Sequence, residues 1–405
     1  MASPDKVKMK TPIVEMDGDE MAKILWAMIK NDLILPFVEL KAHYYDLGIK
    51  HQDETDDCVT HEAANAVMKY GVGVKCANIT TTPKRVAEYN LKKLHKSINS
   101  TIRALLGVTV FRKPILARNI KPAIPTWEKP IIIGRHAYGD IYTGVEMNIS
   151  EPGTAEIFFT PSGGGDPIRK TIKEFTGAGV IQAIHNIEDS IETFAAACFS
   201  FAYEQKIDLW LSVKDSISKI YDVRFRDIFE EEYNHHWRSK YEAMGIQYSY
   251  MEIDNAVARV IRCKGGMLWA LKNYDGDIMS DMLASAYGSL GMMSSILVSP
   301  KGHFQYEAAH GSVTKHYNEY LKNGEIKTNP TALIFAWSGG LRKRGELDGL
   351  EKLVCFANRL EEAAIVTIES GVMTQDLFQV AGDEPMKKKL STKEFIEAIV
   401  QRLKS

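Results

Sequence analysis

The spacing of apolar and polar residues along this chain switches repeatedly between the period of a strand and that of a helix. Residues 11–37, TPIVEMDGDEMAKILWAMIKNDLILPF, predict a short apolar strand, an acidic turn and an amphipathic helix with apolar residues at helical spacing. The pattern then predicts a helix over 61–71, a buried strand over 72–79, a helix over 84–95 and a strand entering a loop over 129–140. Such alternation indicates an α/β fold with a parallel or mixed sheet covered by helices.

Residues 154–175 break this rhythm, because two β-type runs flank a glycine-rich turn and predict an inserted hairpin. The helical pattern resumes at 189–206, where Phe194, Ala197, Cys198 and Phe201 form an apolar stripe that favours a place in the core. Residues 391–404 begin with a Ser/Thr-x-x-Glu capping box and predict a surface helix.

Composition narrows the function classes. The chain has 405 residues, 45% of them hydrophobic, and a formal net charge of −2, which is too close to neutral for a general attraction to nucleic acid or to an anionic membrane. Five scattered cysteines without a CxxC spacing suit a reducing compartment. No apolar leader region or membrane-spanning stretch is apparent, so we expect a cytoplasmic protein that binds neither membrane nor nucleic acid.

The usual dinucleotide-binding fingerprint is missing. GVGVKC at 71–76 and GAGVIQ at 177–182 each contain G-x-G but lack the third glycine. A nucleotide would therefore bind without the standard Rossmann loop.

Three carboxylates occur within KNYDGDIMSD, residues 272–281. On a helix, Asp277 and Asp281 project from nearly the same face, one turn apart, whereas Asp275 points elsewhere. By spacing alone the stretch favours a polar turn in which Asp277 caps the following helix and Asp281 is solvated. The alternative is a site for a hard cation such as Mg²⁺ or Mn²⁺, which two carboxylates at i and i+4 can share.

Two further stretches combine residues suited to anions. Arg103, Arg112 and Arg135 lie near small polar residues and can form a pocket for carboxylates or phosphate, although each alone is more typical of a surface. In YEAAHGSVTKHY, residues 306–317, a Gly-Ser step precedes a predicted helix that carries Lys315 and His316, which suits phosphate or, equally, a capped surface helix. TNPTA at 328–332 is a turn signal.

Taken together and in order, PIVEMDGDEM, YGVGVKCANIT, KSINSTIR, GVTVFRKP, KPIIIGRHAYGDIY, KNYDGDIMSDM, YGSLGMM, EAAHGSVTKHY and TNPTALIFAW resemble the NADP-dependent isocitrate dehydrogenases of the homodimeric subfamily, over essentially the whole chain. The resemblance implies the α/β fold of isocitrate and isopropylmalate dehydrogenases. It implies a large domain of residues 1–106 and 288–405, a small domain of 107–139 and 188–287, and a β-rich clasp of 140–187 that joins two subunits into a homodimer with shared active sites.

The resemblance also assigns residues. Metal ligands would be Asp277 and Asp281 of one subunit and Asp254 of the other, holding Mg²⁺ or Mn²⁺ as a Lewis acid for the decarboxylation. Isocitrate would be held by Thr80, Ser97, Asn99, Arg103, Arg112 and Arg135. Lys214, from the other subunit, would help to remove the hydroxyl proton, and Tyr142 would protonate the enolate. Without the resemblance, these two would be read as a surface lysine and a core tyrosine.

The implied cofactor is NADP. Lys315 and His316, with Arg259 and Arg262 of the partner subunit, match positions around the adenosine 2′-phosphate, where basic side chains favour NADP over NAD. Arg259 and Arg262 are otherwise the solvated face of a helix. The remaining cofactor positions are Gly311, Ser312, Val313, Thr314 and Asn329. Lys315 stands where the family usually has arginine, and this point charge without a bidentate fork favours reduced NADP affinity or selectivity.

Other departures from the family affect loops. Ile98 and Ser100 replace a proline and a glycine, and Asn255 replaces an acid next to Asp254. ITTTPKR at 79–85, which contains Thr80, replaces a commoner turn, so the resemblance supports Thr80 less strongly than Arg103. Two alternatives to an isocitrate dehydrogenase remain open from the sequence. One is a related dehydrogenase of another 2-hydroxy diacid such as isopropylmalate, and the other is a catalytically silent nucleotide-binding or interaction protein.

Overall fold

The computed structural model describes residues 6–382 and 387–405, which form two compact units. Unit 1 comprises Met1–Tyr138 and Glu188–Ser405, and unit 2 is Gly139–Ile187. The predicted clasp of residues 140–187 falls within unit 2. The predicted division of the remaining chain into a large and a small domain stays a prediction.

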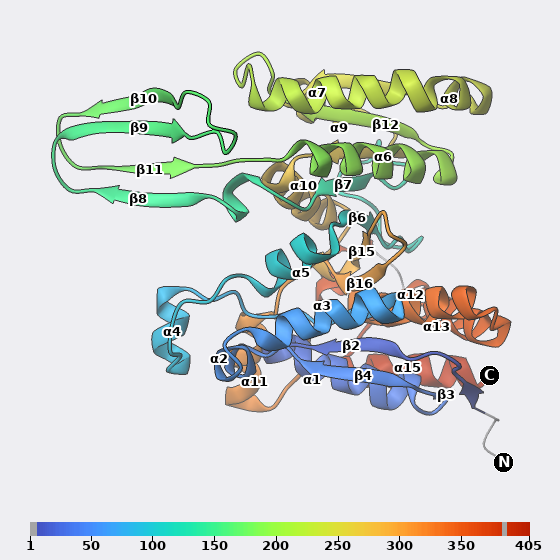
Figure 1. The fold of residues 1–405 in the computed structure, drawn as a ribbon. Helices are drawn as coiled ribbons and strands as arrows, with labels where there is room; N and C mark the ends of the chain where they lie inside the picture. Colours follow the sequence, from blue (N-terminus) through green and yellow to red (C-terminus); the bar gives the residue numbers. More distant parts are fainter. Residues whose placement is uncertain (1–5, 383–386) are drawn as a thin grey trace. The chain divides into compact units, whose positions relative to one another are not determined.

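Unit 1 contains a ten-stranded mixed sheet (Figure 1). From edge to edge its strands are β13 (Tyr248–Glu252), β12 (Asp208–Val213), β14 (Met267–Leu271), β7 (Ile132–His136), β6 (Thr109–Pro114), β15 (Met293–Val298), β16 (Phe304–Ala308), β5 (Val72–Lys75), β2 (Ile13–Asp17) and β4 (Ala42–Asp46). Strands β13 to β7 in this order are mutually parallel, as are strands β16 to β4. Antiparallel pairs β7–β6, β6–β15 and β15–β16 join the two blocks, so the mixed α/β sheet predicted from the sequence is confirmed.

Helices cover both faces of this sheet because successive strand residues point to opposite sides. In β2, Ile13 packs with α1 (Glu20–Ile29), α12 (Thr331–Asp348), α13 (Glu351–Glu369) and α15 (Thr392–Lys404), whereas Val14 packs with α3 (Cys58–Tyr70) and α5 (Ile98–Leu106). In β14, Leu268 packs with α6 (Glu188–Gln205) and α7 (Tyr221–Glu232), whereas Trp269 packs with α9 (Ile253–Val260) and α10 (Asn273–Ala286). Both blocks of strands are therefore buried on both faces.

Shorter elements complete unit 1. They are the α-helices α2 (Ile49–Glu54), α4 (Pro83–Tyr89), α8 (Arg238–Met244), α11 (Thr314–Asn323) and α14 (Gln375–Val380), the π-helical segments η1 (Lys30–Ile34) and η3 (Tyr233–Trp237), and the 3₁₀ helix η4 (Leu290–Met292). Two short strand pairs, β1 (Val7–Lys8) with β3 (Val38–Glu39) and β17 (Val372–Met373) with β18 (Lys388–Lys389), also belong to this unit. Over the described part of the chain, we find no helix with the length and apolar character needed to cross a membrane.

Most local predictions were confirmed. The capping box at Ser391 and Glu394 is present, with reciprocal hydrogen bonds at the start of α15. The helix predicted over 84–95 is wrong in its second half. It ends at Tyr89, because Asn90 adopts a left-handed conformation and the chain turns back so that the Leu91 amide donates to the Val86 carbonyl.

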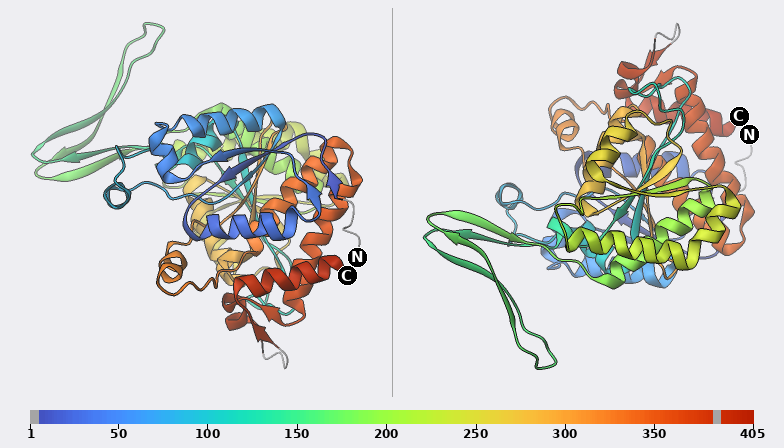
Figure 2. Two further views of the ribbon diagram at one scale, coloured as in Figure 1. Left: turned by 90° about the horizontal axis from the view of Figure 1, so that it is seen from below. Right: turned by 90° about the horizontal axis from the view of Figure 1, so that it is seen from above.

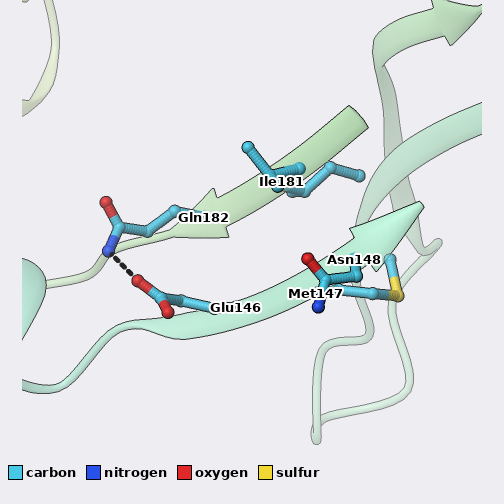
Figure 3. Close-up of a pocket in the computed structure, with 6 residues that line it drawn as sticks. Glu146, Met147, Asn148, Ile181 and Gln182 are labelled. Atoms are coloured by element: carbon cyan, nitrogen blue, oxygen red, sulfur yellow. Dashed lines mark hydrogen bonds between the residues drawn. The ribbon is translucent and has the colours of Figure 1, made fainter. Parts of the chain in front are cut away.

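Unit 2 consists of two antiparallel strand pairs, both visible in Figure 2. Strand β8 (Val145–Ile149) pairs with β11 (Gly179–Ala183), and β9 (Gly153–Phe159) pairs with β10 (Ile168–Phe175), which is the predicted hairpin. The unit also contains the turn η2 (Asp140–Tyr142). A shallow cavity of about 540 Å³ lies on the β8–β11 pair, lined by Met147, Val180 and Ile181 among others. Among its lining residues, Gln182 donates a hydrogen bond to Glu146 across the strand pair (Figure 3).

Candidate functional site

A row of buried polar side chains crosses the middle of the sheet in unit 1. The register sets Arg112 of β6 opposite Ser295 of β15, Ser295 opposite Glu307 of β16, and Glu307 opposite Lys75 of β5. Residues directly opposite one another in neighbouring strands point to the same face. All four are at most 5% exposed, so four adjacent strands present a line of charged and polar groups in an otherwise apolar sheet.

The acids of KNYDGDIMSD lie on α10, which packs against β6 and β7 and brings Asp277 to Arg112, the first residue of this row. All three are inside helix α10, which starts at Asn273, so the interpretation of DGD as a turn with Asp277 as a cap is wrong. Arg112 Nη1 donates to Asp277 Oδ1 at 3.2 Å and to Ser280 Oγ at 2.6 Å, and Arg135 also pairs with Asp277. The sequence-predicted arginines and carboxylates therefore meet in one site.

Gly276 explains how α10 approaches β7 so closely. A Cβ added at this position would lie 2.9 Å from Cβ and Cγ of Arg135 and 3.2 Å from its Cα. Any side chain larger than hydrogen would push the helix off the strand. The glycine that looked like a turn residue is a packing residue within a helix.

Asp277 and Asp281 project from one side of α10, as the spacing predicts. Arg112 Nη1 also lies 4.0 Å from Asp281 Oδ1, and 60% of the Asp281 side chain is exposed. Partial burial raises the pKa of Asp281. The negative charge of Asp277 raises this pKa further, whereas the positive charge of Arg112 lowers it. Because much of the side chain is exposed, solvent limits the size of the shift.

The carboxylate oxygens of Asp277 and Asp281 are of the chemical type that a hard divalent cation prefers, but two side chains do not make a complete ligand set. No three His, Cys, Asp or Glu side chains converge on a possible metal position among residues 6–382 and 387–405. Asp254 lies at the start of α9, where its carboxylate accepts from Lys214 Nζ at 2.9 Å. One chain thus presents two carboxylates, those of Asp277 and Asp281, on the same side of α10 as possible ligands.

Helix α5 supplies the next candidates. Ser97 caps its N-terminus and accepts from the Ser100 amide, and Ile98, which stands where the family has proline, is buried. Arg103 is buried and its Nη2 donates to Glu307 Oε1 at 2.9 Å. Burial raises the pKa of Glu307, but Arg103 and Lys75 outweigh it and hold this pKa below its usual value.

Several buried polar atoms in this region have no hydrogen-bond partner in the described residues. They are Arg103 Nε, Arg112 Nε, Asn99 Oδ1 and Ser295 Oγ. An unsatisfied buried donor costs about 1–3 kcal/mol, so native structures rarely leave such groups without a role. Two guanidinium groups and a hydroxyl with free donor capacity match a bound polycarboxylate.

Thr80 follows β5 and is exposed, whereas its neighbour Thr81 turns inward to donate to the His95 carbonyl at 2.6 Å. Beneath this loop, burial lowers the pKa of Lys75, whose ammonium group donates to the Cys76 carbonyl at 2.8 Å and to the Asn78 side chain. Thr80 thus lies in a loop whose neighbouring residues, Asn78 and Thr81, are held by hydrogen bonds.

Lys214 follows β12 and is held by two carboxylates. Its Nζ donates to Glu252 Oε2 at 2.7 Å and to Asp254 Oδ1 at 2.9 Å, and these bonds raise the pKa of the lysine. Arg259 and Arg262 are exposed; the guanidinium of Arg259 lies 5.5 Å from the centre of the Trp210 ring, and Arg262 lies just beyond the end of α9. Tyr142, in η2, is the only catalytic candidate in unit 2.

The predicted phosphate-binding helix is α11. Val313 precedes it with φ of +61° and gives no side-chain cap, so amides of the first turn have no side-chain acceptor from that residue. Lys315 is exposed, and His316 Nδ1 is 2.8 Å from Thr328 Oγ1. The side chain of Asn329 is engaged in hydrogen bonds within the protein. Its Oδ1 accepts from the Thr331 amide and hydroxyl, and its Nδ2 donates to Asp376.

Ser312 and Thr314 turn their hydroxyl groups inward, to Glu20 at the start of α1. Each donates to Glu20 Oε2 at 2.6 Å. The site thus depends on several residues that the sequence analysis missed, namely Glu20, Lys75, Asn78, Ser280, Ser295 and Glu307. A lysine within the apolar run VGVKCANI was the one local signal for any of them.

Comparison with known proteins places these features in a family. The model of the isocitrate/isopropylmalate dehydrogenase family matches residues 8–399. The chain is 49% identical to a mitochondrial NADP isocitrate dehydrogenase of Saccharomyces cerevisiae, covering all of this chain and 95% of the relative. It is 49% identical to a peroxisomal one of Arabidopsis thaliana (99% and 97% covered) and 46% identical to NADP isocitrate dehydrogenase 1 of Mycobacterium bovis (100% and 98% covered). This protein is therefore a member of the isocitrate/isopropylmalate dehydrogenase family.

Proposed function

We propose that this protein catalyses the NADP-dependent oxidative decarboxylation of isocitrate to 2-oxoglutarate and CO₂, with formation of NADPH. The observation that carries the proposal is a cluster of three buried arginines: Arg112 and Arg135 pair with Asp277 of α10, and Arg103 pairs with Glu307 of β16. The side chains of Arg103 and Arg112 still have unused donor capacity. The names of the relatives, which share 46–49% identity over nearly their whole length, support the same reaction.

In this proposal the three arginines, with Thr80, Ser97 and Asn99, bind and orient the three carboxylates of isocitrate. The guanidinium groups now pair with Asp277 and Glu307, so substrate binding exchanges these partners in part. Buried arginines lose little freedom on binding because the sheet and α10 already fix them.

Asp277 and Asp281, with Asp254 of a second subunit, would hold Mg²⁺ or Mn²⁺. A bound divalent cation supplies Lewis-acid chemistry at the oxygens of the substrate. Asp277 and Asp281 lie one helical turn apart, so their negative charges repel each other. Arg112 and Arg135 offset part of this repulsion, and a bound divalent cation would offset more.

NADP, which accepts the hydride, would bind at α11 through residues 311–316, with Asn329 and the partner's Arg259 and Arg262. The uncapped first turn of the helix suits a phosphate, and Lys315 and His316 suit the 2′-phosphate. Asn329 has its side chain committed elsewhere, so it would contribute through its backbone.

Lys214 would accept the substrate's hydroxyl proton, and Tyr142 would donate a proton to the enolate. In the single chain Lys214 is paired with Glu252 and Asp254, and its pKa is raised, which is opposite to what a base needs. The proposed role therefore requires Asp254 to leave Lys214 when the site is loaded.

We also infer that the protein is a homodimer joined through unit 2. Supporting this, Val145, Met147, Ile157, Phe159 and Val180 of unit 2 are each more than half exposed, a large apolar surface for one subunit. Light scattering of the wild type and of Val180→Asp tests it. We expect a dimer for the wild type and dissociation of the variant, and a monomeric wild type would exclude shared sites. The cytoplasmic location stays a prediction.

The reaction is tested by following absorbance at 340 nm with isocitrate and Mn²⁺, in parallel with NADP, with NAD and with EDTA. We expect turnover with NADP that EDTA abolishes. Turnover of isopropylmalate instead of isocitrate would favour the related dehydrogenase. NADPH binding without turnover of either substrate would favour a catalytically silent member of the family.

A further inference from the structure

Glu20 connects three segments that are far apart in the sequence. It is the first residue of α1, and its carboxylate is buried. Oε2 accepts from the hydroxyls of Ser312 and Thr314, at 2.6 Å each, while Oε1 lies 3.2 Å from Arg85 Nη2 and 3.4 Å from the Tyr89 hydroxyl. One carboxylate thus links α1, α4 and the segment that begins α11. The three helices are labelled in Figure 1.

The link is reinforced by the backbone and by Arg85. The Ala22 amide in the first turn of α1 donates to the Ser312 carbonyl at 3.2 Å. Arg85 Nη2 also donates to Thr314 Oγ1 at 2.8 Å, so the guanidinium, the carboxylate and the threonine hydroxyl contact one another. Burial and the charge of Glu20 raise the pKa of Tyr89 to about 12, which keeps this hydroxyl a neutral donor.

Both sides of the contact are held in unfavourable backbone conformations. Glu20 has φ of +53°, and Val313, which lies between the two hydroxyl donors, has φ of +61°. Left-handed conformations are uncommon for residues other than glycine, asparagine and aspartate, and for a β-branched residue such as Val313 they are costly. Such strain persists only where surrounding contacts impose it, and the hydrogen bonds to Glu20 are those contacts.

We propose that Glu20 is a positioning residue for the cofactor, which fixes Ser312–Thr314 and the start of α11 in the conformation that binds the NADP phosphates. This inference rests on the proposed function, because it takes residues 311–316 as the cofactor segment. By drawing the hydroxyls of Ser312 and Thr314 inward, the carboxylate leaves the amides at the helix N-terminus open to a phosphate. Glu20 has no role in binding isocitrate in this proposal.

The decisive variant is Glu20→Gln, which keeps the size of the side chain and removes its charge. The matched control is Glu15→Gln. Glu15 lies in β2, and its side chain is as buried as that of Glu20. Its carboxylate accepts from Trp26 Nε1 at 3.1 Å and from Lys30 Nζ at 2.7 Å. Both variants lose a buried charge next to a cation, so their thermal stabilities report the common structural cost.

We expect Glu20→Gln to raise KM for NADP about tenfold or more, with KM for isocitrate unchanged and kcat within about threefold, whereas Glu15→Gln leaves KM for NADP at the wild-type value. Ser312→Ala should raise KM for NADP, and adding it to Glu20→Gln should cost little more, because both changes remove one interaction. Glu20→Asp should recover part of the affinity.

An unchanged KM for NADP in Glu20→Gln, or equal changes in Glu20→Gln and Glu15→Gln, would overturn the proposal. If Glu20→Gln does not fold, Glu20→Asp compared with Glu15→Asp carries the same test. If the wild type turns over no substrate, the proposed function fails separately, and NADPH titration followed by fluorescence still compares the two glutamine variants. Equal NADPH affinities in that titration would refute the role of Glu20.

Discussion

Replacing Gly276 with alanine tests whether the packing of α10 on β7 sets the position of the two candidate metal ligands. Gly276 precedes Asp277 directly and faces Arg135, which pairs with that carboxylate. In an exposed helix, alanine in place of glycine stabilises by about 1 kcal/mol. At this position the new methyl group would meet Arg135 instead.

The size of the effect follows from the distances. The added Cβ would stand 2.9 Å from two carbons of Arg135, whereas carbons in favourable contact are about 3.5–4.0 Å apart, so the helix must move by about 0.6 Å or more. Overpacking of this kind costs about 1–3 kcal/mol. We therefore expect the gain in helix propensity to be cancelled or exceeded, with a net loss of 0 to about 2 kcal/mol.

The functional effect should be larger than the effect on stability. A displacement of Asp277 and Asp281 by a fraction of an ångström misplaces groups that must act together, and we expect kcat/KM for isocitrate to fall about tenfold. Ser285→Ala is the control, because Ser285 is exposed on the same helix and alanine there improves propensity without a new contact. It removes one hydrogen bond, from the Ser285 hydroxyl to the Asp281 backbone carbonyl, and leaves both candidate carboxylates in place. The measurements are urea unfolding and the 340 nm assay.

The reasoning would be refuted if Gly276→Ala stabilised the protein as much as Ser285→Ala does and kept full activity. This result would mean that α10 is free to shift on β7 without consequence for the site. Loss of activity with unchanged stability would instead show that the helix moves cheaply but that its position matters.

Three further predictions concern single groups. Asp281→Asn should lower Mn²⁺-dependent turnover at least about 100-fold with an unchanged circular dichroism spectrum, and retained activity would remove Asp281 from the metal site. Lys315→Ala should raise KM for NADP about tenfold and leave KM for NAD unchanged, since only NADP carries the 2′-phosphate; equal effects on both would contradict this role. His136 is buried against Phe194 and Phe225, and burial lowers its pKa to about 3, so it stays neutral in the folded state while the unfolded chain takes up a proton below about pH 6.5. Folding stability should therefore decrease as the pH is lowered from about 6.5 to 3, by up to about 1.4 kcal/mol per pH unit relative to His136→Gln. The same pH dependence of stability in the two proteins over this range would exclude the effect.

The sequence by itself determined the elements whose signals are local. The helices and strands of the α/β alternation, the hairpin over 154–175 and the capping box at Ser391 depend on periodicity and on side chains a few residues apart, and the structure confirms them. Long ordered motifs also carried the family resemblance, which the comparisons bear out. The arginines and acids of the candidate site were named from those motifs.

Tertiary structure alone decided how these groups are held. Gly276 looked like a turn residue because the sequence does not show that Arg135 of a distant strand lies against it. The row from Arg112 through Ser295 and Glu307 to Lys75 exists only through strand register, and the contact of Glu20 with Ser312 spans 292 residues. Buried charges are stable only when partners from distant segments satisfy them, and no local pattern in a sequence records which partners those are.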